Sequence, residues 1–275
     1  MNKLKFIKDT LQKRYDYLLE RGYNVMAVFL QGSQNYDLDI YTDEYQSDID
    51  VKAIVLPTLD EIVKCKSPIS TTIVLDNNEH IEIKDIRVMS DMFIKQNISY
   101  IELLYTDYYI VNPVYEENIK KLIENRERIS KINYNKFLKC IYGMSREKLK
   151  AMEHPYPNIK DKIEKYGYDP KQLHHIARLN DFLVNLLVLK KDLKTCYKPK
   201  ENKDYLIYIK KGGLDLIKAR SLANNLVEEN LKLIKEYSLV KDTVDYQSIN
   251  FLKSWMYSSI KKSLEMELSK KNDKK

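Results

Sequence analysis

In the first 113 residues, the first element that the hydrophobic pattern predicts is a helix. Apolar side chains recur at helical spacing and stop at Gly22, so they predict an amphipathic helix that ends at the glycine. Apolar runs at 25–30, 51–56 and 108–111 predict strands. The residues that define the helix are Leu4, Ile7, Leu11, Tyr15 and Leu18.

Shorter elements are predicted between these strands. Segments 71–75 and 80–86 flank the turn 76–79 and predict a hairpin, and a short helix is expected from Pro57. Ser90 and Asp91 predict the cap of a helix that runs to about Gln96. The segment 98–105 fits either a helix or a strand. Together these elements predict a small mixed sheet with helices.

From Val114 onward the pattern is mostly helical. Asp169 followed by Pro170 is a clear helix start, with an N-cap and a proline at the first helical position. We therefore expect an α/β (α+β) domain over 1–125 and an α-helical domain over 126–275. The periodic stretches are 115–129, 134–153, 170–190, 214–239 and 246–268, with loops at 154–157 and 194–213.

The composition indicates a chain that can form a sizeable hydrophobic core without disulfide bonds. Of its 275 residues, 44% are hydrophobic, and the three cysteines have no paired spacing that would indicate a disulfide framework or a zinc site. The N-terminus alternates charged and apolar residues, unlike a signal peptide, and no apolar run reaches membrane-spanning length. We expect a cytoplasmic protein with no membrane partner.

Charge is divided unevenly along the chain. Residues 1–125 carry 14 Lys and Arg against 21 Asp and Glu, whereas residues 126–275 carry 33 against 19. The helical part, with a net charge of +14, could hold a polyanion such as RNA. A genome rich in Lys, Asn, Ile and Tyr codons would produce a similar excess, so this alternative stays open.

Two polar motifs follow the first two strands closely. Gly32 and Ser33 end an apolar run, where a glycine lets the backbone approach a ligand and the serine offers a hydroxyl and an N–H to anionic oxygens. Asp48 and Asp50 stand two apart at the start of the next run, so both side chains project from one face of a strand. Two such carboxylates favour a hard divalent cation, Mg²⁺ or alternatively Mn²⁺. The pattern predicts a metal site facing a phosphate-binding turn.

Two-metal phosphoryl chemistry needs a third carboxylate. Glu82 is the best candidate because it is flanked by Ile81 and Ile83, as expected on a strand with one buried face. A strand exposed to solvent would show the same alternation. Asp85 is the competitor, although it precedes a helix and could instead be a capping residue.

With these motifs in this order, the chain resembles the nucleotidyltransferases of the DNA polymerase beta superfamily. The resemblance is closest to a poorly characterised bacterial and phage branch, some members of which are associated with RNA repair. It covers residues 24–115 well, through 32–36, Ser47 and 83–87, and extends in patches to 101–105 and 173–179. Where that branch usually has glycine after the tyrosine, this chain has Asp37.

The resemblance implies a mixed-sheet catalytic domain and specific roles for the motif residues. Asp48, Asp50 and Glu82 would bind the metals, and Gly32 and Ser33 would hold the triphosphate of a nucleoside triphosphate such as ATP. A hydroxyl of the acceptor would attack the α-phosphate and displace pyrophosphate.

Further basic residues are secondary candidates for binding nucleotide or acceptor. Lys84 and Arg87 flank Glu82 and could offset pyrophosphate charge, or could be ordinary surface cations. On the helix that starts at Pro170, a basic patch is predicted at three- and four-residue spacing, which a solvated helix face would also explain. The patch comprises Lys171, His174, His175 and Arg178.

The sequence thus predicts a metal-dependent transfer of a nucleoside monophosphate, with RNA as the expected acceptor. Transfer to a protein or a small molecule is the alternative within the same chemistry. A non-catalytic nucleotide-binding or nucleic-acid-binding module is the alternative outside it. Nothing in the sequence selects the nucleotide or the oligomeric state.

Overall fold

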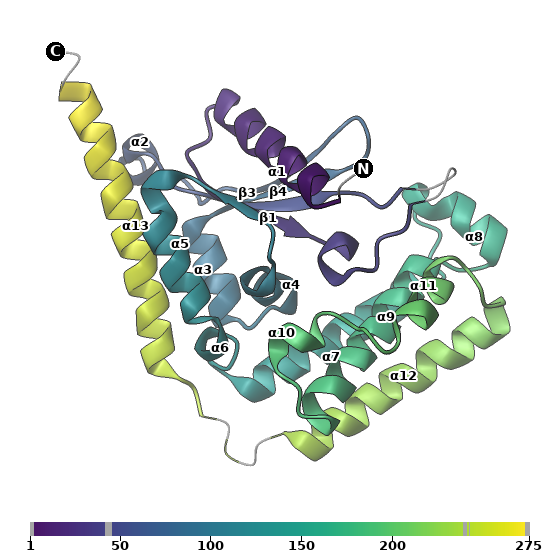
Figure 1. Ribbon diagram of the computed structural model, residues 1–275. Coiled ribbons are helices and arrows are strands. Elements are labelled where there is room, and N and C mark those ends of the chain that lie inside the picture. Colours follow the sequence, from purple (N-terminus) through teal and green to yellow (C-terminus); the bar gives the residue numbers. More distant parts are fainter. Residues whose placement is uncertain (1–2, 42–45, 239–240, 242, 273–275) are drawn as a thin grey trace. The chain divides into compact units, whose positions relative to one another are not determined.

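The computed structural model describes residues 3–41, 46–238, 241 and 243–272, and the chain forms two compact units (Figure 1). The first comprises residues 1–35, 41–132 and 244–275, and the second comprises 36–40 and 133–243. This division differs from the one expected at residue 125, because the last helix packs against the first unit. Polar and apolar residues are poorly separated between the faces of that helix, so the sequence did not show which part of the chain it packs against.

A five-stranded mixed sheet organises the first unit, in the order β3-β4-β2-β1-β5. β1 pairs antiparallel with β2 and β5, β2 pairs parallel with β4, and β3 pairs antiparallel with β4. The expected strands and the hairpin are confirmed, and so is the mixed α/β class. Their bounds are β1 Val25–Gln31, β2 Asp50–Val55, β3 Ser70–Val74, β4 His80–Asp85 and β5 Tyr109–Val111.

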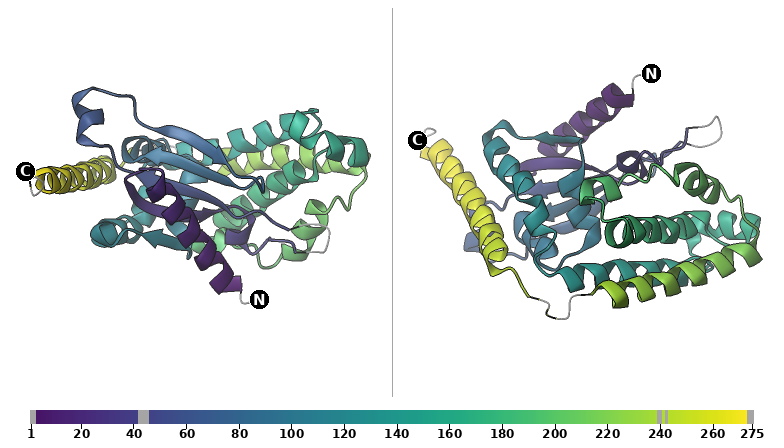
Figure 2. Two further views of the ribbon diagram at one scale, coloured as in Figure 1. Left: turned by 90° about the horizontal axis from the view of Figure 1, so that it is seen from above. Right: turned by 60° about the horizontal axis from the view of Figure 1, so that its bottom comes forward.

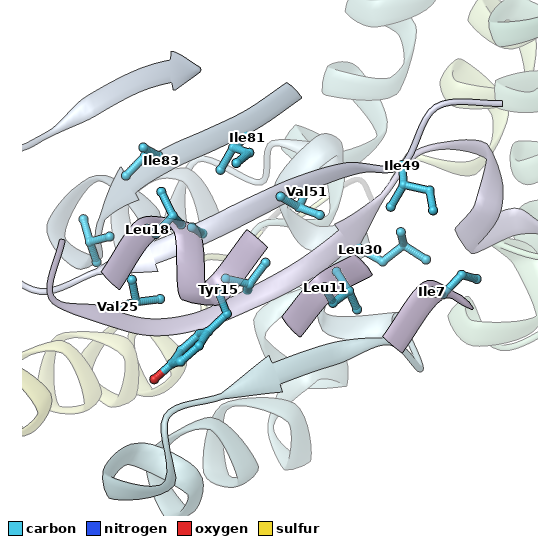
Figure 3. Packing of buried hydrophobic residues seen from close by; sticks show 13 residues of the cluster. Ile7, Leu11, Tyr15, Leu18, Val25, Leu30, Ile49, Val51, Ile81 and Ile83 are labelled. Atoms are coloured by element: carbon cyan, nitrogen blue, oxygen red, sulfur yellow. The ribbon is translucent and has the colours of Figure 1, made fainter. Parts of the chain in front are cut away.

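The helix α1 (Lys3–Glu20) covers one face of this sheet (Figures 2 and 3). Four of the five apolar positions that the helical spacing identified pack against buried residues of the sheet, whereas the fifth, Leu4, is 46% exposed. The shared core of α1 and the sheet comprises Ile7, Leu11, Tyr15, Leu18, Val25, Val28, Leu30, Ile49, Val51, Ala53, Val55, Ile81 and Ile83.

Helices of the same unit pack against the sheet, against one another and along the C-terminal helix. α3 packs on β2 and β4, the turn η2 packs on β1, and α13 lies alongside α3 and α5. The indole of Trp255 donates to the carbonyl of Asn118 at 3.0 Å, which ties α13 to α5. Their bounds are α3 Ile86–Ile94, α4 Ile98–Ile101, η2 Glu102–Tyr105, α5 Glu116–Glu124, α6 Arg126–Ile129 and α13 Tyr246–Asn272.

The second unit is a helical bundle in which α9 (Pro170–Leu183) packs against α7, α11 and α12. Asp169 caps α9 by accepting from the backbone N–H of Lys171 at 3.0 Å, as its position before proline predicts. The remaining bounds are α7 Tyr134–Ala151, α8 Lys160–Tyr166, the π-helical turn η5 Val184–Val188, α10 Leu193–Cys196, α11 Lys203–Lys210 and α12 Leu216–Tyr237.

Two local expectations were wrong. The helix expected to begin at Ser90 begins at Ile86, because Asp85 provides its N-cap. The loop expected over 194–213 contains α11, whose buried Leu206 and Ile209 pack in the bundle despite the surrounding lysines. The ambiguous segment 98–105 is helical. Among the described residues, no helix is both long and apolar enough to span a membrane.

Candidate active site

The turn after β1 has the conformation that its glycine permits. Gly32 has φ +87°, a left-handed value that residues with a side chain rarely adopt, and a Cβ there would meet no atom within 4 Å. Ser33 opens the 3-10 helix η1 (Ser33–Tyr36), in which the N–H of Asn35 donates to the carbonyl of Gly32 at 3.0 Å. Asp37, which stands where the branch that the chain resembles usually has glycine, has φ +58°. Aspartate is among the few residues that tolerate this conformation, so the turn can form without that glycine.

Strand register brings the glycine turn and the aspartate pair to one end of the sheet. Asp50 is the cross-strand neighbour of Gln31, and Gly32 follows Gln31 directly. Ile49 is buried in the core beneath α1, so the alternation of the chain directs Asp48 and Asp50 to the opposite side. Residues 42–45 of the acidic connection lie outside the described residues. The predicted proximity of the two motifs is therefore present in the first unit.

Asp50 also contacts β4, through a residue that the sequence analysis did not select. Its Oδ1 accepts from the backbone N–H of His80 at 2.8 Å and lies 3.1 Å from Nδ1 of the same residue. No described residue hydrogen-bonds to Oδ2 of Asp50. The signal for His80 was its place in the alternation His80, Glu82, Lys84, which puts three polar side chains on one face of β4.

Glu82 lies in the next row of the same face, paired with a buried lysine. Its cross-strand neighbour is Lys52, whose side chain is only 2% exposed and whose Nζ lies 2.7 Å from Oε2 of Glu82. Oε1 of Glu82 accepts from the hydroxyl of Tyr100 at 2.7 Å and lies 3.1 Å from Nζ of Lys84. The ammonium of Lys52 also sits 4.4 Å from the centre of the Tyr100 ring. Both oxygens of Glu82 are thus occupied.

These contacts determine the protonation of the cluster. Burial raises the pKa of Glu82, but the charge of Lys52 and the hydrogen bonds from Lys52, Tyr100 and Lys84 outweigh it and hold that pKa below its ordinary value. Burial, followed by the hydrogen bond to Glu82, raises the pKa of the Tyr100 hydroxyl. Glu82 is therefore ionised near neutral pH, and the neutral hydroxyl of Tyr100 donates a hydrogen bond to it. Lys52 was not selected from the sequence, although a single lysine in the run Val51–Val55 is an unusual residue for a buried strand.

The carboxylate of Asp85, the alternative third metal ligand, is hydrogen-bonded to Arg87 instead. It is 1% exposed, and its Oδ1 accepts from the backbone N–H of Arg87 at 2.8 Å, which caps α3. The guanidinium of Arg87 adds two hydrogen bonds, from Nε at 2.8 Å and from Nη2 at 2.7 Å. This bidentate pairing raises the pKa of Arg87. The capping interpretation of Asp85 is confirmed, and Arg87 is its partner.

The remaining predicted phosphate ligands fall into two groups. Lys84 is on β4 next to Glu82 and donates to the hydroxyl of Ser70 at 2.8 Å. Its role and that of Arg87 toward pyrophosphate stay predictions. Lys171, His174, His175 and Arg178 are on α9 in the second unit, where His174 and Arg178 are buried and His175 is half-buried.

The geometry does not assemble three carboxylates around one point. Among the described residues, no group of three His, Cys, Asp or Glu side chains lies close enough together to hold a metal ion. Asp48 and Asp50 offer hard oxygens and fit a divalent cation, whereas Glu82 would have to release Lys52, Lys84 or Tyr100 first. A separate groove of about 550 Å³ runs along β5 and α5, and no predicted site residue is among those that line it.

Comparisons with known proteins add little to this geometry. No protein-family model matches the chain, and no curated protein matches its sequence. Among solved structures, it is similar to a nucleotidyltransferase-like protein from Exiguobacterium sibiricum 255-15, determined at 1.90 Å resolution. The similarity covers 84% of this chain and 77% of the other, with 12% identity and a TM-score of 0.29.

Proposed function

We propose that the first unit transfers a nucleoside monophosphate from a nucleoside triphosphate to an acceptor hydroxyl and releases pyrophosphate. The observation that carries the proposal is the register in which Gln31 neighbours Asp50. That register places the Gly32-Ser33 turn and the Asp48-Asp50 pair at the same end of one sheet. The resemblance to the polymerase beta superfamily, based on the same motifs in the same order, supports the choice of reaction.

Each part of the site has a distinct task in this reaction. The N–H groups and hydroxyl of the turn would bind the phosphates, because a glycine with a left-handed φ leaves the backbone open to an anion. Asp48 and Asp50 would hold Mg²⁺, which when bound would stabilise charge on the attacking and leaving oxygens. Oδ2 of Asp50 has no hydrogen-bond partner among the described residues, so both of its lone pairs are available to a metal.

The chemical step is an in-line displacement at the α-phosphorus. The acceptor hydroxyl oxygen forms a bond to this phosphorus, the bond to the oxygen that bridges the α- and β-phosphates breaks, and pyrophosphate leaves. The hydroxyl proton passes to solvent or to a carboxylate of the Asp48-Asp50 pair. Glu82 is a poor acceptor for that proton, because its lowered pKa makes it a weak base. Its sequence-based role as a third metal ligand stays a prediction.

The test is a pair of matched double variants. Asp48→Asn with Asp50→Asn should retain the circular dichroism spectrum and lose pyrophosphate release by at least about 100-fold, since a neutral amide holds a divalent cation poorly. Asp9→Asn with Asp16→Asn, on the exposed face of α1, is the control and should remain active. Undiminished turnover of the first pair would contradict the proposal. A search for labelled product with each nucleoside triphosphate separates an enzyme from a non-catalytic module.

RNA is the proposed acceptor, because residues 126–275 carry a net charge of +14 while the catalytic part is acidic. RNA binding should then weaken steeply as salt increases. The deciding experiment incubates the protein with labelled nucleotide, metal and cell extract, and treats the product with RNase or protease. Label that survives RNase and is lost with protease would instead identify a protein acceptor.

A further inference from the structure

Arg178 is a buried cation to which the described residues offer no anion. The residue is 6% exposed, and its guanidinium lies 4.1 Å from the centre of the Tyr36 ring. Its Nε is buried without a hydrogen-bond partner, and the guanidinium forms no ion pair within the described chain. Guanidinium groups taken out of water are normally paired, because an uncompensated buried charge is destabilising. This arginine is therefore poised for an acceptor from outside the chain.

The one acid on the same helix is already bound. Asp181 is buried one turn beyond Arg178, and its Oδ1 accepts from Asn202 at 2.6 Å. Its Oδ2 accepts from Asn185 at 2.9 Å. Each oxygen of the carboxylate thus accepts a hydrogen bond from an amide. Burial outweighs these hydrogen bonds and raises the pKa of Asp181. Asp181 is thus not the missing counter-ion of Arg178.

A second unsatisfied group lies one helical turn before Arg178. His174 is 3% exposed, and its Nε2 is buried with no hydrogen-bond partner among the described residues. Residues four apart on a helix share a face, so the two side chains neighbour each other. Burial, followed by the charges of Lys210, Arg178 and Lys171, holds the pKa of His174 well below its ordinary value. The imidazole is therefore neutral and has one N–H to donate.

Basic side chains of two helices lie near this pair. Lys171 and Arg178 come from α9, and Lys210 comes from α11, where its Nζ donates to the carbonyl of Leu38 at 2.9 Å. Three cations near a neutral histidine create a positive potential in a region with little solvent. We propose that Arg178 and His174, with the ring of Tyr36 beneath the guanidinium, form a binding site for a phosphate oxyanion.

Phosphate suits this site better than a carboxylate or a halide. A guanidinium donates two parallel hydrogen bonds to a tetrahedral oxyanion, and a third oxygen remains for the imidazole N–H. The phosphate could come from a nucleotide or from a polynucleotide backbone. The proposed function uses a nucleoside triphosphate, so the nucleotide is the source that we expect.

The inference deepens the proposed function and rests on it only for the source of the phosphate. It also narrows the basic patch that the sequence predicted on α9, which comprised Lys171, His174, His175 and Arg178. His175 is half-buried, whereas the unsatisfied nitrogen belongs to His174. Binding can be measured without divalent metal and without turnover, so failure of the transfer reaction and failure of this site give different results.

The experiment measures binding of pyrophosphate by calorimetry in the presence of a chelator. Arg178→Gln should weaken binding at least about tenfold, and Arg178→Lys should give an intermediate loss because an ammonium cannot make the bidentate contact. His174→Gln should weaken binding less than Arg178→Gln. Arg146→Gln is the matched control, since Arg146 also lies over a tyrosine of the second unit, 5.8 Å from the ring of Tyr142, but is exposed. The control should bind like the wild type.

Two kinds of result, one from binding and one from folding, would overturn the site. One is a wild-type chain that binds no pyrophosphate, or an Arg178→Gln variant that binds it as well as the wild type does. The other is an Arg178→Gln variant that fails to fold in anion-free buffer in which Arg146→Gln folds, because the arginine would then be a structural cation.

Parallel titrations identify the source of the phosphate. The probes are metal-free ATP and a single-stranded RNA oligonucleotide with a 5′-hydroxyl. We expect Arg178→Gln to reduce affinity for ATP and to leave the RNA affinity unchanged. Equal losses for both would assign the site to backbone phosphates, and loss for neither would overturn it.

Discussion

Among the described residues, two Lys or Arg side chains are buried, Lys52 in the first unit and Arg178 in the second, and they differ in their partners. Lys52 in the sheet is 2% exposed, with Glu82 at 2.7 Å and the Tyr100 ring beneath it. Arg178 in the bundle is 6% exposed and has only the ring of Tyr36. Aromatic faces support both charges, but only one cation has a carboxylate.

The difference separates a structural charge from a charge available for binding. A lysine with a carboxylate and an aromatic ring is complete, so its removal should affect folding first. An arginine without an anion raises the free energy of the folded state until a ligand supplies one. Mutation of the two cations and their partners should therefore affect stability very differently.

The largest effect is expected where the complete pair is broken. Glu82→Gln leaves Lys52 buried without a counter-ion and should lower the free energy of unfolding by about 3–5 kcal/mol. Adding Lys52→Met to it should recover much of that loss, since both charges are then gone. Urea unfolding followed by circular dichroism measures both variants.

The exposed pair of Lys64 and Asp60 gives the control for this measurement. Their side chains are 62% and 51% exposed, so Asp60→Asn should leave the free energy of unfolding nearly unchanged. A Glu82→Gln variant that is more stable than the wild type in metal-free buffer would contradict the ion-pair role. That result would favour the sequence-based role, in which three metal ligands repel one another.

Sequence patterns predicted the parts of the site that depend on local order. Gly32-Ser33 and Asp48-Asp50 follow directly from where two strands end and begin, and alternation along β4 placed Glu82 on the polar face. These local patterns could not predict which residues lie opposite each other on neighbouring strands. Parallel register sets Lys52 rather than Asp50 beside Glu82, and nothing within a single strand specifies it.

The same limit applies to the second unit. Helical spacing identified the basic face of α9, but a helical pattern alone cannot say whether that face is buried. Packing of α11, which was expected to be a loop, contributes to the burial of this face. Return of α13 to the first unit was missed for the same reason, since contacts such as Trp255 with Asn118 span 137 positions.

An intermediate effect is expected from a cation that is paired but not fully buried. Asp85→Ala removes the N-cap of α3 and leaves Arg87, whose side chain is 26% exposed, without its carboxylate. Loss of a cap costs about 1–2 kcal/mol, and partial hydration limits the cost of the freed guanidinium. Urea unfolding should therefore place this variant between the wild type and Glu82→Gln. A loss as large as that of Glu82→Gln would show that exposure does not govern the series.

A smaller effect concerns the pH dependence of stability near Arg178. Because the pKa of His174 is lowered in the folded state, the unfolded chain binds protons first as pH falls below about 6.5, and stability should decline there. One histidine contributes at most about 1.4 kcal/mol per pH unit. His174→Gln should flatten this decline in urea unfolding between neutral and mildly acidic pH, with the exposed His154→Gln as control. His175, whose pKa is lowered in the same direction, leaves a residual slope.

The smallest effect is expected for Arg178→Gln in anion-free buffer. An unpaired buried charge contributes no ion pair to lose, and its removal ends an electrostatic cost, while some packing against Tyr36 is lost. These effects oppose each other, so we expect a change within about 1 kcal/mol, against the much larger loss for Glu82→Gln. Added pyrophosphate should then stabilise the wild type and leave Arg178→Gln nearly unchanged, because only the wild type gains a ligand on folding. Urea midpoints with and without pyrophosphate measure this difference. A loss of several kcal/mol in anion-free buffer would show that Arg178 is held as Lys52 is, and the contrast between the two buried cations would disappear.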